Sequence, residues 1–370
     1  MTEMKIDSLN IAAIDVGSNA ARLLMKHIDI DLDGNPTIRK SLFLRIPLRL
    51  GMDVFNEGKL SDKRADQFLH TVKAYRQLMK VYGVKIYRAC ATSAMRDAKN
   101  GKEVLKRIEK DTGIKMEIIS GDEESQMVYD NHYSLMSGEG NFLYVDVGGG
   151  STEVTFMSNG KRLFSHSFNV GTIRLLKNKV KSETLMELKN TVEKVTKGYD
   201  NIVIIGSGGN INKLFRLANK RDKTKEYLPV DTLRRLCDRL NKLSVEERMD
   251  VFSLKPDRAD VIVPAAEIFL HMASSAHVDK IMVPNIGLAD GIINDLLASY
   301  LNKKKYWCPL NRYNDLWNPF GLKESRSKHY ATSPSFNFVN FQEGLPKPSP
   351  MLPPNPFPGV PRIHERQYST

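Results

Sequence analysis

The chain has 370 residues, a hydrophobic fraction of 41% and a formal net charge of +12, which suit two folded domains that bind anionic ligands. Three distant cysteines (Cys90, Cys237 and Cys308) argue against a disulfide framework or a zinc site, and no apolar run reaches the ~18 residues of a membrane helix. Since the first residues lack a signal-peptide pattern, we expect a reducing, cytoplasmic location, with neither membrane nor nucleic acid as a partner.

The apolar pattern of the first third predicts mixed strands and helices. Residues 11–16 form an apolar run typical of a buried strand, and the turn at 17–19 leads into a second strand. The expected elements are strands over 11–16, 21–29 and 37–50, a helix over 61–82 with Ser61 as N-cap, a strand over 84–90, a helix over 102–111, a strand over 115–119 and a helix over 121–133.

The opening pattern then returns in the second half of the chain. IAAIDVGSNAARLLM and FLYVDVGGGSTEVTF share a strand, an Asp-Val-Gly turn and a second strand, with Asp15 and Asp146 in the same place. We interpret this match as a duplicated unit. The further expected elements are strands over 142–147, 151–157 and 161–168, a third glycine turn within 202–214, and helices to about residue 301 with one short strand near 280–283.

The last part of the chain differs in composition. Residues 306–370 hold 11 of the 17 prolines and show no sustained period, so we predict a mostly disordered tail. Such a tail can bind partner domains as an extended helix, or can have no function of its own.

The glycine turns indicate phosphate binding. Successive backbone N–H groups in such turns form a concave anion site, although a single turn of this kind is usually structural. Two matched turns with Asp15 and Asp146 at their strand ends can hold phosphates and Mg²⁺, which prefers carboxylates together with retained waters. Glu153 faces either the same metal or the outside of its strand.

Five motifs in order resemble the exopolyphosphatase/guanosine pentaphosphate phosphohydrolase family. They cover about residues 11–300 and are DVGSN (15–19), ATSAMRDA (91–98), SGDEES (120–125), VDVGGGSTE (145–153) and IGSGGN (205–210). The resemblance implies the α/β fold of actin-like ATPases, with two ribonuclease-H-like lobes and a cleft between them. We therefore expect lobes over 1–122 and 123–303 and a Pro-rich tail over 304–370.

The resemblance also implies roles for individual residues. Glu124 would be the catalytic base, and Asp146 and Glu153 would serve the metal, which Asp15 joins by the turn argument. The expected phosphate-binding residues are Gly17, Ser18, Asn19, Thr92, Ser93, Arg96, Gly148, Gly149, Gly150, Ser151 and Gly208. Two-lobed relatives often dimerise, which suggests a homodimer.

The residues themselves give Glu124 a second argument. It follows a predicted strand near the start of a predicted helix, where a carboxylate can reach an attacking water. A helix-start carboxylate favoured by the macrodipole is the alternative, and Arg96 is either a phosphate ligand or a surface ion-pair residue. The hypothesis is in-line attack of water on a terminal phosphorus of polyphosphate, with Mg²⁺ as cofactor.

Other functions stay open on the sequence alone. Guanosine pentaphosphate 5′-phosphohydrolase shares the same motifs, and a phosphate or alarmone sensor would bind without hydrolysis. A kinase of the same fold would need a catalytic Asp where this chain has Glu123-Glu124. The first hairpin continues Ala20-Ala21-Arg22, which departs from many relatives, and no helical C-terminal domain follows, which favours short polyphosphate or a nucleotide.

Overall fold

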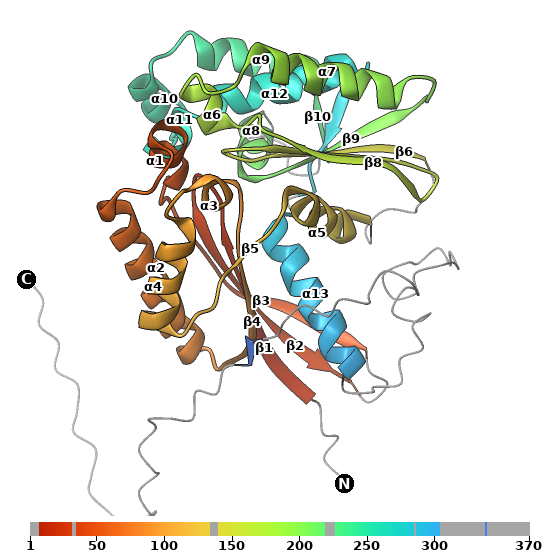
Figure 1. The fold of residues 1–370 in the computed structure, drawn as a ribbon. Helices are drawn as coiled ribbons and strands as arrows, with labels where there is room; N and C mark the ends of the chain where they lie inside the picture. The colour runs from red at the N-terminus through yellow and green to blue at the C-terminus, as the bar shows by residue number, and fades with distance from the viewer. Residues whose placement is uncertain are drawn as a thin grey trace, which may run out of the picture. The chain divides into compact units, whose positions relative to one another are not determined.

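The computed structural model describes residues 7–31, 35–133, 140–218, 226–284, 286–303 and 337–338. Within these residues, two six-stranded mixed sheets and the helices that cover them form an α/β fold (Figure 1). The predicted tail over 304–370 lies outside the described residues, apart from the strand at 337–338.

The first sheet has the strand order β12-β4-β1-β2-β3, with β5 beside β4. β1 pairs antiparallel with β2 and parallel with β4. The strands are β1 (Asp7–Val16), β2 (Ala21–Ile30), β3 (Pro36–Ile46), β4 (Val84–Ala91), β5 (Glu117–Ile118) and β12 (Asn337–Phe338), and the helices between them are α1 (Leu50–Glu57), α2 (Asp62–Val81), α3 (Ser93–Asp97) and α4 (Gly101–Thr112).

The second sheet repeats this plan in the order β10-β11-β9-β6-β7-β8. β6 pairs antiparallel with β7 and parallel with β9, as β1 does with β2 and β4. The strands are β6 (Asn141–Val147), β7 (Thr152–Ser158), β8 (Lys161–Phe168), β9 (Ile202–Ser207), β10 (Tyr227–Pro229) and β11 (Lys280–Met282), and the helices are α6 (Thr172–Leu176), α7 (Ser182–Thr196), α8 (Gly209–Ala218), α9 (Val230–Asn241), α10 (Val245–Phe252), α11 (Pro256–Ala259) and α12 (Ile262–Ser275). The shared strand plan agrees with a duplicated unit.

β1 is buried on both faces, which explains why its sequence is a continuous apolar run. Ala12, Ile14 and Val16 join the core under α2 and α4, while Ile11 and Ala13 face a second core built by α13 (Leu288–Lys303). Figure 1 shows α2 and α4 on one side of this sheet and α13 on the other. The strand that carries the first glycine turn is therefore held between two apolar layers.

The packing of two helices does not follow the predicted lobe boundary at residue 122. α13 belongs by sequence to the second predicted lobe, yet it packs on β1, β2 and β4 of the first sheet. α5 (Gly121–Tyr133) contacts both α13 and the strands β6 to β8. The lobe boundaries stay a prediction, and the chain returns to its first sheet after completing the second.

Most predicted elements agree with the structure within a few residues. Ser61 caps α2, since its side chain accepts a hydrogen bond from the Arg64 backbone N–H at 3.3 Å. The strand predicted over 37–50 is wrong at its end, because β3 stops at Ile46 and Leu50 begins α1. The strand ends where Pro47 follows Ile46, because proline has no N–H for a sheet ladder, and Arg49 then adopts a left-handed conformation (φ 54°) at the start of α1.

Candidate active site

The two glycine hairpins have the same backbone turn. In the first, the Gly17 N–H donates to the Ala20 carbonyl at 3.0 Å, and in the second the Gly148 N–H donates to the Ser151 carbonyl at 3.0 Å. Asp15 stands opposite Arg22 across the first hairpin, and Asp146 stands opposite Glu153 across the second. The matched turns predicted from sequence are thus matched in structure, each with an aspartate beside it.

The hairpin turns touch each other. A β-carbon built on Gly149 would lie 3.0 Å from the Ser18 Cβ, and one built on Gly150 would lie 2.5 Å from the Ser93 Oγ. The Ser18 and Ser93 hydroxyls share a hydrogen bond of 2.8 Å. Only glycine leaves room for this approach, which brings three predicted phosphate-binding segments together.

The third glycine turn lies against the second hairpin. Gly208 has a φ of 98°, a conformation that favours glycine, and a β-carbon there would lie 2.7 Å from Asp146 Oδ1. The neighbouring Ser207 hydroxyl donates to the Ile286 carbonyl at 3.2 Å. The side-chain N–H₂ of Asn19, in the first hairpin turn, donates to the Asp257 carbonyl at 3.0 Å.

The Glu124 side chain is bound by Arg96, which follows β4 in the chain. Arg96, one turn after the strand, donates from Nη1 to Glu124 Oε2 at 3.0 Å and to the Ile119 carbonyl at 2.8 Å. Thr92 is buried, and its backbone N–H donates to the Val16 carbonyl at 3.1 Å, which ties this segment to the first hairpin. The catalytic candidate is therefore a buried carboxylate with a guanidinium partner.

Three carboxyl groups interact strongly at this site. Burial raises the pKa of Glu124 well above its usual range, the charges of Glu153 and Asp146 raise it further, and Arg96 lowers it. Burial and then Glu153 raise the pKa of Asp146 to about 7. Burial also raises the pKa of Glu153, against hydrogen bonds from neighbouring serines. Such mutual shifts are typical of functional sites.

Two of these carboxyl groups, together with that of Asp15, suit a divalent cation. Asp15, Asp146 and Glu153 supply the hard oxygen ligands that Mg²⁺ prefers, and a cation would relieve their repulsion. Within the described part of the chain, no group of three or more His, Cys, Asp or Glu residues is arranged to hold a metal by itself. Mg²⁺ commonly keeps waters and binds through one or two carboxylates plus phosphates, so the donor set fits, and the three-residue site stays a prediction.

Two arginines at the site were not assigned a role from the sequence. Arg22 forms an ion pair with Asp15, and the cross-strand register of a hairpin is the signal that places them opposite each other. Arg258 begins no motif and lies in a helical stretch, so the sequence gives no comparable signal. It donates to Asn210, beside the third glycine turn.

Arg258 is a cation without a carboxylate of its own. Asp257 pairs with Arg45 at 2.6 Å, and among the described residues no carboxylate forms an ion pair with Arg258. Burial and then the neighbouring charges of Arg45 and Arg22 lower the pKa of Arg258 to about 9. This excess of positive charge favours an anion next to Gly209.

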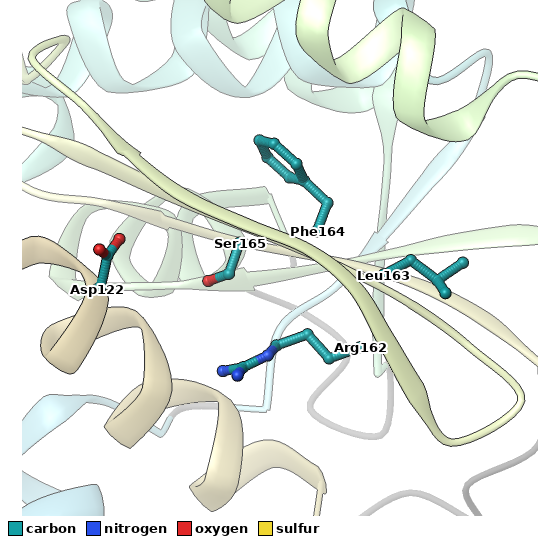
Figure 2. Close-up of a pocket in the computed structure, with 5 residues that line it drawn as sticks. All are labelled: Asp122, Arg162, Leu163, Phe164 and Ser165. Atoms are coloured by element: carbon teal, nitrogen blue, oxygen red, sulfur yellow. The ribbon is translucent and has the colours of Figure 1, made fainter.

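A cavity of about 340 Å³ lies between the start of α5 and β8 (Figure 2). Its lining residues are Asp122, Arg162, Leu163, Phe164 and Ser165. A bulge in β8 leaves Leu163 without an opposite residue, since Met157 pairs with Arg162 and Phe156 with Phe164. Figure 2 shows Phe164 on the opposite side of the strand from Ser165. Its lining residues do not include Asp15, Glu124, Asp146 or Glu153.

Two sheets of one strand plan, each opening with a glycine-turn hairpin, define an α/β protein of the actin-like ATPase class. The profile of the Ppx/GppA phosphatase family matches residues 44–300, and the chain belongs to this family. The predicted family and fold are confirmed. The predicted enzyme class, phosphoanhydride hydrolase, is confirmed at the level of the family.

Several known proteins are similar to the chain. A bifunctional 3-dehydroquinate synthase/phosphatase of Fusobacterium nucleatum is 27% identical and covers 79% of the chain, which spans 47% of that protein. Exopolyphosphatase 1 of Mycobacterium tuberculosis is 24% identical and covers 77% of the chain and 87% of its own length. A guanosine-5′-triphosphate,3′-diphosphate pyrophosphatase of Aeromonas salmonicida is 24% identical, and 59% of its length is matched by 78% of the chain.

The fold has also been solved in a relative. The crystal structure of the Aquifex aeolicus Ppx/GppA family member is 28% identical, has a TM-score of 0.63 and covers 80% of the chain and 99% of its own length. Among the helices of the described residues, none combines the length and apolar character that a membrane crossing requires.

Proposed function

We propose that the chain is an exopolyphosphatase that removes the terminal phosphate of inorganic polyphosphate with Mg²⁺ and a glutamate base. The observation that supports it most directly is the buried Glu124, paired with Arg96 and electrostatically linked to Glu153 and Asp146. Glu124 and Arg96 supply a base and a cation, and Asp146 and Glu153, whose charges raise the pKa of Glu124, supply oxygen ligands for a metal. This combination suits hydrolysis better than binding alone.

The residues divide the work of the reaction. The turn N–H groups at Gly148 to Gly150 bind phosphate oxygens, and Arg96 neutralises charge on the transferring group. Glu124 accepts the proton of the attacking water, and its raised pKa, which burial and the charges of Glu153 and Asp146 cause, increases its affinity for that proton. Asp15, Asp146 and Glu153 would hold Mg²⁺, which when bound neutralises phosphate charge.

Glu124→Gln tests the base directly. It keeps the size of the side chain but cannot take a proton, so we expect phosphate release to fall about 10²- to 10⁴-fold with the fold retained. The assay measures phosphate from polyphosphates of several lengths with Mg²⁺, and Glu103→Gln, an exposed residue of α4, serves as control. Parent-like turnover by a folded Glu124→Gln variant would remove Glu124 from this role.

A specific observation favours guanosine pentaphosphate as a second candidate substrate. The cation Arg258 beside Gly209 has no carboxylate partner within the described residues, and a nucleotide with phosphates at two positions would supply an anion there. Rates on guanosine pentaphosphate and on short polyphosphate, measured with one preparation, separate the two substrates. A phosphate sensor, the alternative without catalysis, would bind both and release no phosphate.

The cellular location and the oligomeric state are further parts of this proposal. Cys90 and Cys237 are free and buried, which agrees with a reducing cytoplasm. The homodimer suggested by the resemblance stays a proposal, and sedimentation of the full chain would test it.

A further inference from the structure

Arg88 forms ion pairs with three carboxylates from three different elements. Its side chain, 6% exposed, lies on β4 and donates to Glu117 of β5 from Nε at 3.2 Å and from Nη2 at 2.9 Å. Nη2 also donates to Glu123 of α5 at 2.7 Å, and Nη1 donates to Asp295 of α13 at 3.1 Å. A planar guanidinium can make all these bonds at once, which a lysine cannot.

The strand alternation of β4 explains where Arg88 points. Ile86 and Cys90, two residues to either side, belong to the core that α13 builds, whereas Tyr87 and Ala89 face α2 and α4. Arg88 therefore faces α5 and α13. These two helices are in close contact, since a β-carbon on Gly291 would lie 2.5 Å from the Met127 carbonyl oxygen.

The same stretch of chain holds two consecutive glutamates with two arginines. Arg88 on β4 binds Glu123, and Arg96 just after β4 binds Glu124. Successive residues of a helix point about 100° apart, so two such bonds fix the rotation of the first turn of α5 about its axis. The direction of the Glu124 carboxylate depends on that rotation.

We propose that Arg88 is a positioning residue for hydrolysis, which acts through Glu123 to aim Glu124 at the reacting water. This inference rests on the proposed role of Glu124. Arg88 itself contacts neither the glycine turns nor Glu124 in any hydrogen bond of the described residues. Arg88 therefore affects the reaction only through the orientation of the Glu124 carboxylate.

A matched pair of variants separates positioning from general support of the fold. Glu117 accepts two of the Arg88 bonds and Glu123 accepts one, so a purely structural network makes Glu117→Ala the more damaging change. If Arg88 instead acts by positioning Glu124 through Glu123, Glu123→Ala is the more damaging change. We expect Glu123→Ala to lower kcat about 100-fold with KM changed by less than about threefold, and Glu117→Ala to lower kcat by less than about threefold.

Two further measurements complete the test. Arg88→Lys should reproduce the loss in kcat, and adding Glu123→Ala to it should cost less than about threefold more, because both changes break one bond. Equal losses in Glu117→Ala and Glu123→Ala, or a loss in KM alone, would overturn the inference.

A crystal structure of Glu123→Ala gives an answer independent of turnover. We expect Glu124 Oε2 to move away from Arg96 Nη1, which lies 3.0 Å from it here. An unmoved Glu124 would overturn the inference even if the enzyme is active. A parent protein that hydrolyses no phosphoanhydride would instead refute the proposed function, and the structure would still decide whether Arg88 aims Glu124.

Discussion

At the scale of single residues, the site holds buried acidic and basic side chains whose charged forms the surrounding protein disfavours. Burial raises the pKa of Glu124, Asp146 and Glu153, and the charge of Glu153 raises the pKa of the other two further, while burial and neighbouring arginines lower the pKa of Arg258. A folded chain tolerates such groups where a ligand completes them, because each is costly alone. The phosphates and cation of a substrate complex would compensate both sets.

Arg96→Gln tests the link between Arg96 and Glu124. Arg96 lowers the pKa of Glu124 by charge and hydrogen bond, so its removal raises that pKa further. A base must be ionised to act, and the acidic limb of kcat against pH should therefore move to higher pH, together with a loss in kcat of at least about tenfold. Steady-state rates between pH 5 and 9 measure this, and a limb that stays in place or moves to lower pH contradicts the link.

Arg258→Met should weaken substrate binding and leave stability unchanged or higher. The guanidinium is disfavoured by burial and by Arg45 and Arg22, so the fold loses little with it, whereas a bound phosphate loses its cation. We expect KM to rise about tenfold with kcat within about threefold.

Arg248→Gln is the matched control for that experiment. Arg248 donates to the Leu240 carbonyl at 2.7 Å and to the Ala259 carbonyl at 3.1 Å, both structural groups of the same region. Its loss should lower the melting temperature without changing KM. A KM for Arg258→Met equal to that of the parent would exclude a substrate contact.

At the scale of elements, the second hairpin depends on the start of α6. The Thr172 and Ile173 N–H groups donate to the Gly148 and Gly149 carbonyls at 3.1 and 2.8 Å. Gly171 packs so closely that a β-carbon on it would lie 2.5 Å from the Gly149 carbonyl oxygen. A glycine turn that looks local in sequence is thus supported by residues 22 to 24 positions later.

Gly171→Ala should displace the second hairpin. The atoms that the new methyl group meets belong to the backbone, which cannot rotate aside as a side chain can. Overpacking of this kind costs about 1–3 kcal/mol, and we expect a lower melting temperature and a loss in kcat/KM of at least about tenfold. Gly287→Ala, where a β-carbon meets open space, is the control, and equal behaviour of the two variants contradicts this role.

The sequence predicted the elements that have a strong period and missed those set by tertiary contacts. The hairpins of β1–β2 and β6–β7 follow from their apolar strands and glycine turns, and α2 follows from its spacing and Ser61 cap. α1 was missed because its start depends on the left-handed Arg49, and α3 because five residues show no period.

The same limit applies to the site. Glu124 and Arg96 could be named from the sequence because they stand in motifs that resemble those of a known family, and Glu124 also follows a predicted strand near the start of a predicted helix. Arg258 and Gly171 could not, since each reaches a glycine turn from a distant segment that has no motif.

At the scale of the whole molecule, the first sheet is completed by the last described helix. Both faces of β1 are apolar, and α2 and α4 cover only one of them. α13 covers the other with the buried side chains Ile292, Ile293, Leu296, Leu297 and Leu301. The chain thus needs residues near 300 to finish a core that begins at residue 9.

Two shortened chains, ending at residues 287 and 303, test this dependence. Burying five such side chains contributes roughly 7–15 kcal/mol, which is as large as the ~5–15 kcal/mol net stability of a typical protein. We expect the chain ending at 287 to lose its cooperative thermal transition. The chain ending at 303 keeps α13 and every proposed site residue, and it should keep kcat on short polyphosphate within about twofold of the full chain. Calorimetry and phosphate release measure both outcomes. A folded, active chain ending at 287 would show that α13 is dispensable, because the face of β1 that it covers would then be stable without it.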